Sequence, residues 1–204
     1  MELIFVKEQG EDHLEKQRTN ENAVMPVVQH TKRMTKEKYE EIQNYRVRTC
    51  QTIEKLHSLH EKPVMTLRAN YPGEDKNNEI TRLVNREIAK TFDEIFQTKI
   101  LAVENFDTPE GPTTFYVVKG DARTLKENAI YIEQNHELGR FVDIDVYDID
   151  EEYAVTRVEL AYEPRKCFLC DEPAKDCSRN KTHNTQDLVD FMVEQVRAYL
   201  EKKE

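Results

Sequence analysis

Residues 139–146 read GRFVDIDV, a glycine-led stretch that becomes a strict alternation of apolar and acidic residues. Successive side chains of a β-strand point to opposite faces, so Asp143 and Asp145 share one face while the valines and the isoleucine share the other. One apolar face and one acidic face are typical of an antiparallel sheet that packs on a core from one side. The stretch therefore predicts a strand that buries its apolar face.

The two aspartates form a candidate metal site. Their α-carbons are about 7 Å apart in an extended strand, which lets their carboxylate oxygens converge on one hard cation. Mg²⁺ is such a cation, because it accepts one or two protein carboxylates and keeps water and phosphate oxygens as its other ligands. A solvated acidic face on an antiparallel strand is the alternative, and the pair alone does not exclude it.

A second candidate site lies further along the chain. Three of the four cysteines follow the spacing C-x2-C-x6-C, and a histidine comes after five more residues. These residues are Cys167, Cys170, Cys177 and His183. Thiolates and an imidazole at such spacing can bind a tetrahedral Zn²⁺ ion. A compact turn of reduced cysteines without a metal is the alternative.

Basic residues are interleaved with the cysteines, although the chain as a whole carries a formal net charge of −10. They are Arg165, Lys166, Lys175, Arg179 and Lys181, against three acidic residues in the same segment. Arginine and lysine bind phosphate groups well, arginine through two parallel N–H bonds. The segment therefore favours a phosphorylated or pyrophosphate-bearing ligand.

Hydrophobic periodicity and turn residues divide the remaining chain into elements. Helices are expected over 35–60, from a cap at Asn77 to residue 96, over 121–135 and over 185–202. Further strands are expected over 64–69, 100–106, 113–118 and 156–162. The last of these is expected to return antiparallel to the strand after Gly139. This order predicts an α+β fold: a mainly antiparallel sheet with its helices packed on one side and a small Cys/His-rich turn before the C-terminal helix.

The domain organisation follows from composition. Residues 8–22 are charged and nearly free of apolar side chains, so residues 1–34 are expected to form a poorly ordered or loosely docked extension. The chain is 38% hydrophobic, which is enough for one core of ordinary size, so residues 35–204 are expected to form a single domain.

Charge and hydropathy exclude two classes of function. The negative net charge argues against general nucleic-acid binding, whose usual mark is clustered positive charge. No apolar run approaches the length of a membrane span, and residues 1–6 lack the basic flank of a signal peptide. With four unevenly spaced cysteines, these features predict a reducing, cytoplasmic location.

Three segments together resemble the citrate lyase holo-acyl-carrier-protein synthase family, also called apo-citrate lyase phosphoribosyl-dephospho-CoA transferase. They are residues 139–146, the pair PRKCFLC (164–170) and CSRNKTH (177–183), and the loop NYPGEDK (70–76), which is similar to that family's Asn-x-Pro-Gly-x-x-Lys loop. The resemblance covers about residues 36–195. The run around the aspartates is weak alone, but its fixed order with the cysteine segment is specific.

The resemblance implies a nucleotidyltransferase-type enzyme. Such an enzyme moves the 2′-(5″-triphosphoribosyl)-3′-dephospho-CoA group onto a serine of the citrate lyase acyl carrier protein and releases pyrophosphate. Asp143, Asp145 and Arg140 are then the expected catalytic residues, with Mg²⁺ on the two aspartates. The expected substrate-binding residues are Asn70, Lys76, Gly139, Arg165, Arg179, Lys181 and His183.

Two further expectations concern Lys76 and the partner protein. Lys76 lies just ahead of a predicted helix, where backbone N–H groups and the helix dipole favour anions, although an ordinary turn with a surface lysine explains it equally well. Because acyl carrier proteins are usually acidic, the first long helix is the candidate docking surface. Its basic residues are Lys36, Lys38, Arg46 and Arg48. The alternative function is a non-catalytic zinc-knuckle adaptor that binds an acidic protein.

Overall fold

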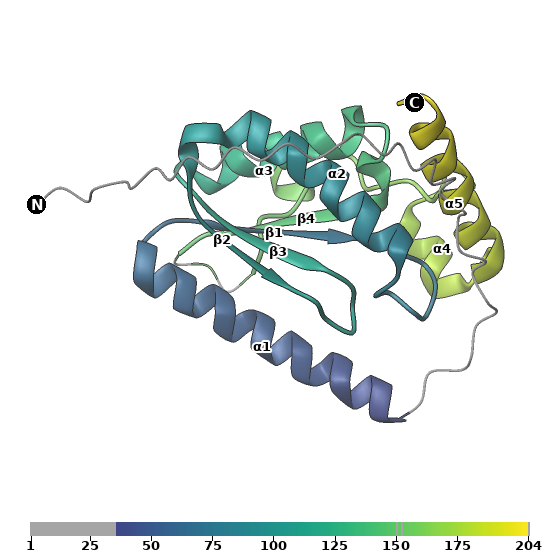
Figure 1. The fold of residues 1–204 in the computed structure, drawn as a ribbon, viewed down its shortest axis with the longest axis horizontal. Coiled ribbons are helices and arrows are strands. Elements are labelled where there is room, and N and C mark those ends of the chain that lie inside the picture. Colours follow the sequence, from purple (N-terminus) through teal and green to yellow (C-terminus); the bar gives the residue numbers. More distant parts are fainter. Residues whose placement is uncertain (1–35, 150, 152, 204) are drawn as a thin grey trace, which may run out of the picture.

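A computed structural model describes residues 36–149, 151 and 153–203, so the expected extension over residues 1–34 lies outside the described residues. The centre of the fold is a four-stranded antiparallel sheet with the strand order β2-β3-β1-β4 (Figure 1). The strands are β1 (Val64–Ala69), β2 (Ile100–Phe106), β3 (Thr113–Val118) and β4 (Val142–Tyr147). The α-helices are α1 (Lys36–His60), α2 (Glu79–Phe96), α3 (Ala122–Asn135), α4 (Ala174–Asn180) and α5 (Thr185–Glu201). The α+β class, the antiparallel sheet and the Cys/His-rich segment before the last helix are confirmed.

Helices cover both faces of the sheet. The larger core lies between one face and helices α2, α3 and α5, and it includes Met65 and Leu67 of β1. The opposite face is covered by α1, whose Ile53 and Leu56 pack with Phe115 of β3. The expectation that the helices pack on one side is therefore corrected for α1 (Figure 1). Strand β3 explains the difference, because it is buried along its whole length and needs a layer on each face.

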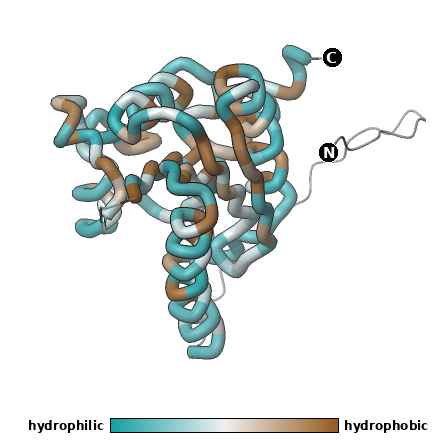
Figure 2. The backbone as a smooth tube through the Cα atoms, turned by 90° about the vertical axis from the view of Figure 1, so that its left-hand side faces the viewer, coloured by the Kyte–Doolittle hydropathy of each residue, from teal (hydrophilic) through white to brown (hydrophobic). Residues whose placement is uncertain are grey.

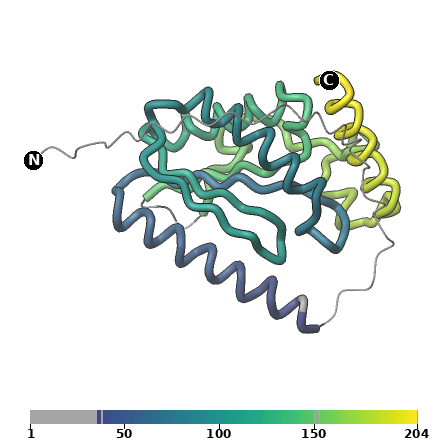
Figure 3. Tube along the Cα trace, in the orientation of Figure 1, coloured from purple at the N-terminus to yellow at the C-terminus, as the bar shows by residue number. Residues whose placement is uncertain are grey.

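The order of strands places β1 inside the sheet. Figure 3 traces how the chain leaves α1 and enters β1. Strand β3, which also pairs with β2, then lies on one side of β1, and β4 lies on the other. The hydropathy of the backbone is uneven: hydrophobic segments gather in the body of the molecule, whereas α1 is mostly hydrophilic (Figure 2). Polar contacts also connect α1 to the sheet. In the central part of α1, the Tyr45 hydroxyl donates to Thr113 Oγ1 of β3 at 2.9 Å.

Side-chain caps determine where α2 and α3 begin. Asn78, not the expected Asn77, caps α2: its Oδ1 accepts from the Thr81 N–H at 3.0 Å, and Thr81 Oγ1 accepts from the Asn78 N–H at 3.1 Å. This reciprocal pair is a capping box, which satisfies two backbone donors at once. Asp121 caps α3 by accepting from the next backbone N–H groups along the helix.

The expected strand over residues 156–162 is wrong. This segment contains a 3-10 turn, Val158–Leu160, which ends at Ala161 in the left-handed region with φ 58°. Glu159 stabilises the turn by accepting from the Thr156 N–H at 2.6 Å. The outer edge of β4 therefore has no neighbouring strand among the described residues and is instead bonded mainly by side chains.

Among the described helices, none is both long enough and apolar enough to cross a lipid bilayer.

Gly139 opens the 3-10 turn Gly139–Phe141 that leads into β4, and it packs closely against α3. A Cβ atom built on it would lie 2.2 Å from the carbonyl oxygen of Ile132 and 2.9 Å from that of Glu133. Only a hydrogen atom fits in this space, so the glycine has a packing role, and the substrate-binding role expected for it stays a prediction.

Gly139→Ala should lower the free energy of unfolding by about 1–3 kcal/mol, the usual cost of overpacking. The reason is that the added methyl group must push the turn away from α3. Urea denaturation measures the change, with Gln134→Ala on the exposed side of α3 as the control. An unchanged midpoint in Gly139→Ala would contradict the close packing.

Candidate functional site

The acidic pair of β4 lies on the face of the sheet that α1 covers. In the register, Asp143 is opposite Arg68 of β1, which is opposite Thr113 of β3. Asp145 is opposite Thr66, which is opposite Phe115. Both aspartates are partly exposed, while their neighbours along β4 are buried. The alternation in the sequence thus places two carboxylates side by side in a polar zone beneath α1.

Asp143 is held by two arginines. Arg165 Nη1 donates to its Oδ1 at 2.7 Å, and Arg68 Nη2 lies 3.8 Å from its Oδ2. Asp143 and Arg165, both expected site residues, are more than twenty residues apart in the sequence. The fold brings them into direct contact. Arginine is suited to this position because its planar fork can bind a carboxylate and a phosphate with the same geometry.

Each of these arginines is in turn oriented by a buried acid. Arg165 Nη2 lies 2.7 Å from Glu133 Oε1, and Arg68 Nη1 donates to Glu110 Oε2 at 2.8 Å. The side chains of Glu133 and Glu110 are only 3% and 6% exposed. Buried charges must be paired, so these ion pairs fix the arginines before any ligand arrives. Asp143 consequently has two preorganised cations next to it.

Asp145 has a different environment. Lys126 of α3 is buried, donates to the carbonyl oxygen of Ile144 at 2.7 Å, and lies 3.8 Å from Asp145 Oδ1. Partial burial and the charge of Asp143 raise the pKa of Asp145 above its ordinary value, and the cations of Lys126 and Arg68 offset this only in part. The second carboxylate is thus ionised at a cost to the folded state.

The sequence did not indicate several residues of this site: Arg68, Glu110, Lys126, Glu133, and Arg157, whose Nη2 pairs with Glu133 Oε2. A signal was present for two of them. Lys126 and Glu133 are seven residues apart, two helical turns, and so lie on the same side of α3 as the apolar residues. Charged side chains in a buried stripe are almost always paired, which points to a network. For Glu110, in the loop between β2 and β3, the sequence offers no comparable signal.

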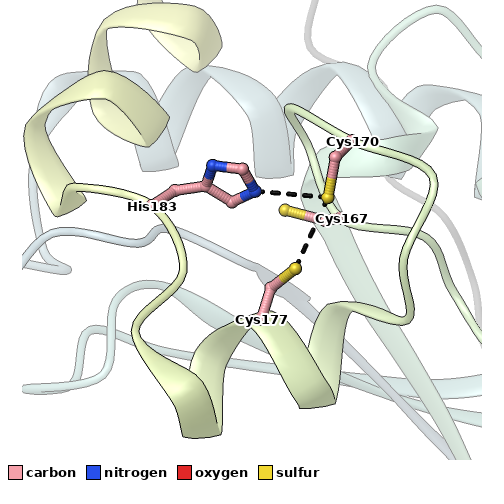
Figure 4. A group of neighbouring side chains, drawn as sticks. All are labelled: Cys167, Cys170, Cys177 and His183. Carbon is pink, nitrogen blue, oxygen red and sulfur yellow. Dashed lines mark hydrogen bonds between the residues drawn. The ribbon is translucent and has the colours of Figure 1, made fainter.

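The cysteine segment brings its four candidate ligands together (Figure 4). All their ligand atoms lie within 4.8 Å of one another. His183 Nε2 is 3.2 Å from Cys170 Sγ, which is 3.5 Å from Cys177 Sγ. Helix α4, which the sequence did not predict, carries Cys177 into the cluster. Three sulfur atoms and one imidazole nitrogen in this space fit the ligand set of a structural zinc site.

The other expected site residues are more dispersed. Lys76 and Arg46 line a pocket of about 330 Å³ together with Glu110, which connects that pocket to Arg68 and the aspartates. The backbone N–H of Asn70 donates to the Phe141 carbonyl oxygen at 2.7 Å, which ties the loop after β1 to the start of β4.

Three basic residues near the cysteines do not join the acidic pair. Arg140 is exposed, and its guanidinium lies 5.8 Å from the centroid of the Phe168 ring. Arg179 in α4 and Lys181 just after it are exposed, and neither forms an ion pair with Asp143 or Asp145 within the described part of the chain. Their expected roles in catalysis and substrate binding stay predictions.

The chain matches known proteins of one family over most of its length. A family model described as apo-citrate lyase phosphoribosyl-dephospho-CoA transferase matches residues 37–199. The chain is 31% identical over 123 residues to Protein CitXG of Leuconostoc mesenteroides subsp. cremoris, covering 59% of this chain and 26% of that protein. It therefore spans about a quarter of the length of that relative.

Two further relatives are of more similar length. The chain is 29% identical over 136 residues to the apo-citrate lyase phosphoribosyl-dephospho-CoA transferase of Escherichia coli O7:K1, covering 65% of this chain and 74% of that protein. It is 30% identical over 144 residues to a protein of Vibrio cholerae serotype O1 named probable apo-citrate lyase phosphoribosyl-dephospho-CoA transferase, covering 69% and 80%.

Asp145→Asn should make the folded state more stable at pH 7. Because the pKa of Asp145 is raised on folding, its ionised form costs folding free energy above that pKa, and the cost fades as the pH falls through it. The asparagine carries no charge at any pH and avoids the cost.

Urea denaturation without divalent cations tests this expectation. The midpoint of Asp145→Asn should exceed that of the wild type at pH 7, and the difference should shrink in acid. Asp93→Asn, an exposed aspartate of α2, serves as the control. A lower midpoint for Asp145→Asn at pH 7 would mean that the cations beside this carboxylate outweigh its burial.

Proposed function

Since the chain belongs to the apo-citrate lyase phosphoribosyl-dephospho-CoA transferase family, we propose that it attaches the 2′-(5″-triphosphoribosyl)-3′-dephospho-CoA group to a serine of the citrate lyase acyl carrier protein. The family match includes all four strands and the whole cysteine segment. The observation that carries the assignment of the site is Asp143, flanked by two arginines that are each anchored on a buried acid.

The reaction asks for positioning and for neutralisation of charge. The serine oxygen attacks the innermost phosphorus of the triphosphate, a new P–O bond forms, and the P–O bond to pyrophosphate breaks as the serine proton passes to a base. Negative charge builds on the phosphoryl oxygens and on the leaving pyrophosphate. Arg68, Arg165 and Lys126 are the cations around the aspartates that would meet this charge, and fixed cations stabilise it better than water does.

Asp143 and Asp145 would hold Mg²⁺. Their carboxylate oxygens are ligands that Mg²⁺ prefers, they share one face of β4, and the Asp145 side chain is 41% exposed and so within reach of an ion. The repulsion between the two carboxylates is what a bound cation would relieve. When bound, Mg²⁺ supplies charge neutralisation and orientation for phosphate oxygens.

Cys167, Cys170, Cys177 and His183 would hold Zn²⁺ in a structural role. The donor set matches zinc, and the cluster includes two buried cysteines. Arg165 lies two residues before the first of these ligands, in a segment that pairs with itself through the Lys166–Pro173 bridge. A metal here would therefore fix the segment that presents Arg165 to Asp143.

Docking of the acidic carrier protein on α1 stays a prediction. Arg46 is partly committed to the fold, because its Nη2 lies 3.2 Å from Glu110. Lys36 is 3.7 Å from Glu40 in an exposed pair, and Arg48 is exposed. The side chain of Lys38 lies outside the described residues. The alternative function, a non-catalytic adaptor, would leave the anchored arginines beside Asp143 without a use.

Asp143→Asn and Asp145→Asn should each lower the rate of transfer by a factor of at least about a hundred, the scale for loss of a principal charge-stabilising group. Mass spectrometry of the carrier protein, incubated with enzyme, Mg²⁺ and donor, measures the product directly. Asp93→Asn on α2 should transfer at the wild-type rate. Wild-type turnover in both site variants would remove the metal-site role of the pair.

The purified protein should contain about one zinc ion per chain, and chelation should lower its melting temperature, since the free energy of metal binding adds to that of folding. Cys170→Ser should lose the metal. Cys50→Ser is the matched control, because Cys50 is an exposed cysteine outside the cluster. If the purified protein contains no metal and chelators do not change its melting temperature, the segment is a compact turn of reduced cysteines without a metal.

A further inference from the structure

A groove separates α1 from the hairpin formed by β2 and β3. Its volume is about 490 Å³, within the range of small-molecule sites. The walls come from one side of α1, including Tyr45 and Thr49, and from the hairpin, including Phe106 and Phe115. None of the residues assigned to catalysis or metal binding lines this groove. We propose that it binds the adenine base of the dephospho-CoA donor, an inference that rests on the proposed function.

The aromatic wall suits a nucleobase. Phe106 is 42% exposed at the end of β2, and its ring meets the buried Phe115 ring edge to face, with centroids 5.6 Å apart. This contact positions the Phe106 ring, while the residue remains partly accessible from the groove that it lines. Flat bases bind proteins largely by stacking on such rings, whatever their sequence context.

The helical wall supplies polar groups that match the edge of a purine. Asn44 and Gln51 line the groove, and side-chain amides can both donate to and accept from adenine. The Thr49 hydroxyl oxygen is buried and has no hydrogen-bond partner among the described residues. An unpaired buried hydroxyl is costly, and a ligand that bonds to it removes the cost.

The groove lies at the correct distance from the acidic pair. Phe115, Thr66 and Asp145 are successive partners across three strands, so Phe115 is about 10 Å from Asp145, at about 4.8 Å per strand. Phe106 is one strand further out in the neighbouring row, about 14 Å from Asp143. The groove and the pair share one face of the sheet, with Arg68 and Thr113 between them.

The donor has matching dimensions. Its triphosphate is on the 5″ carbon of a ribosyl group attached to the 2′ oxygen of adenosine, so two sugars separate the reacting phosphorus from the base. Bonds of about 1.5 Å give an extended reach of roughly 10–13 Å from that phosphorus to the base. With the phosphorus beside the aspartates, the base arrives at the Phe115 edge of the groove, where the Phe106 ring lies next to it with its centroid 5.6 Å from that of Phe115. Two cations on the groove wall could meet the diphosphate of the CoA arm: Arg48, which is exposed, and Lys55, which lies 3.3 Å from Glu104.

Binding of 3′-dephospho-CoA, which has the base but lacks the triphosphate, tests the groove without any transfer reaction. Phe106→Ala should weaken its binding in titration calorimetry by about tenfold, the scale of a lost stacking contact. Thr49→Val, which replaces only the hydroxyl, should weaken it less. Both should raise KM for the full donor with little change in kcat, and neither should change the binding of inorganic triphosphate.

Val103→Ala is the matched control. Val103 is 44% exposed on the same strand but points to the other face of the sheet, away from the groove. It should leave dephospho-CoA binding and donor KM unchanged, and thermal melting checks that all three variants fold.

The possible outcomes separate this inference from the proposed function. Unaltered dephospho-CoA affinity and donor KM in Phe106→Ala and Thr49→Val would overturn the groove while transfer by the wild type still stands. A rise in KM for the carrier protein alone would assign the groove to the carrier and also overturn the proposal. Phe106-dependent binding of dephospho-CoA without any transfer by the wild type would support the groove and refute the proposed function.

Discussion

The unpaired outer edge of β4 is the constraint from which the site is built. The last strand of a sheet exposes backbone N–H and C=O groups that must find partners. Here Glu133 accepts from the Ile144 N–H at 3.1 Å, Lys126 donates to the Ile144 carbonyl, and Arg165 donates to the Val142 carbonyl. The same three side chains surround the aspartates on that strand. The same side chains therefore satisfy the backbone groups at the edge of β4 and form the charged site.

The charged network around β4 does not neutralise its two aspartates equally. The network neutralises Asp143 well, through Arg165 and Arg68. It neutralises Asp145 less well, so the pKa of that carboxyl is raised. A carboxyl whose pKa is raised by burial and by a second carboxylate beside it is typical of a functional site. The cysteine cluster contributes at a distance, since it organises the segment that begins at Arg165.

Local patterns in the sequence predict most of the fold, and long-range pairing accounts for what they miss. The strands over 64–69, 100–106 and 113–118 are confirmed with their bounds, because β-branched and aromatic runs between turn residues are local signals. The strand expected over 156–162 does not form: Val155 N–H donates to the Val146 carbonyl oxygen at 2.8 Å, but at Val142 and Ile144 side chains distant in sequence already bond the edge that the strand would have joined. Helix α4 escaped prediction because seven residues are too few to display a periodicity. In the site, the spacing of the aspartates and of the cysteines is a local pattern that the sequence displays. The role of Glu110 depends on its contact with Arg68, forty-two residues away, which no local pattern indicates.

The two margins of the sheet are unequal. At β4, side chains from α3 and from the cysteine-bearing segment seal the margin, while at β2 the outer backbone groups face no other strand among the described ones. A sheet closed on one side can lengthen only from the other. Strand pairing through β2 would use the one margin left open among the described residues of each copy, so association by this route terminates at two molecules and does not propagate into a fibre.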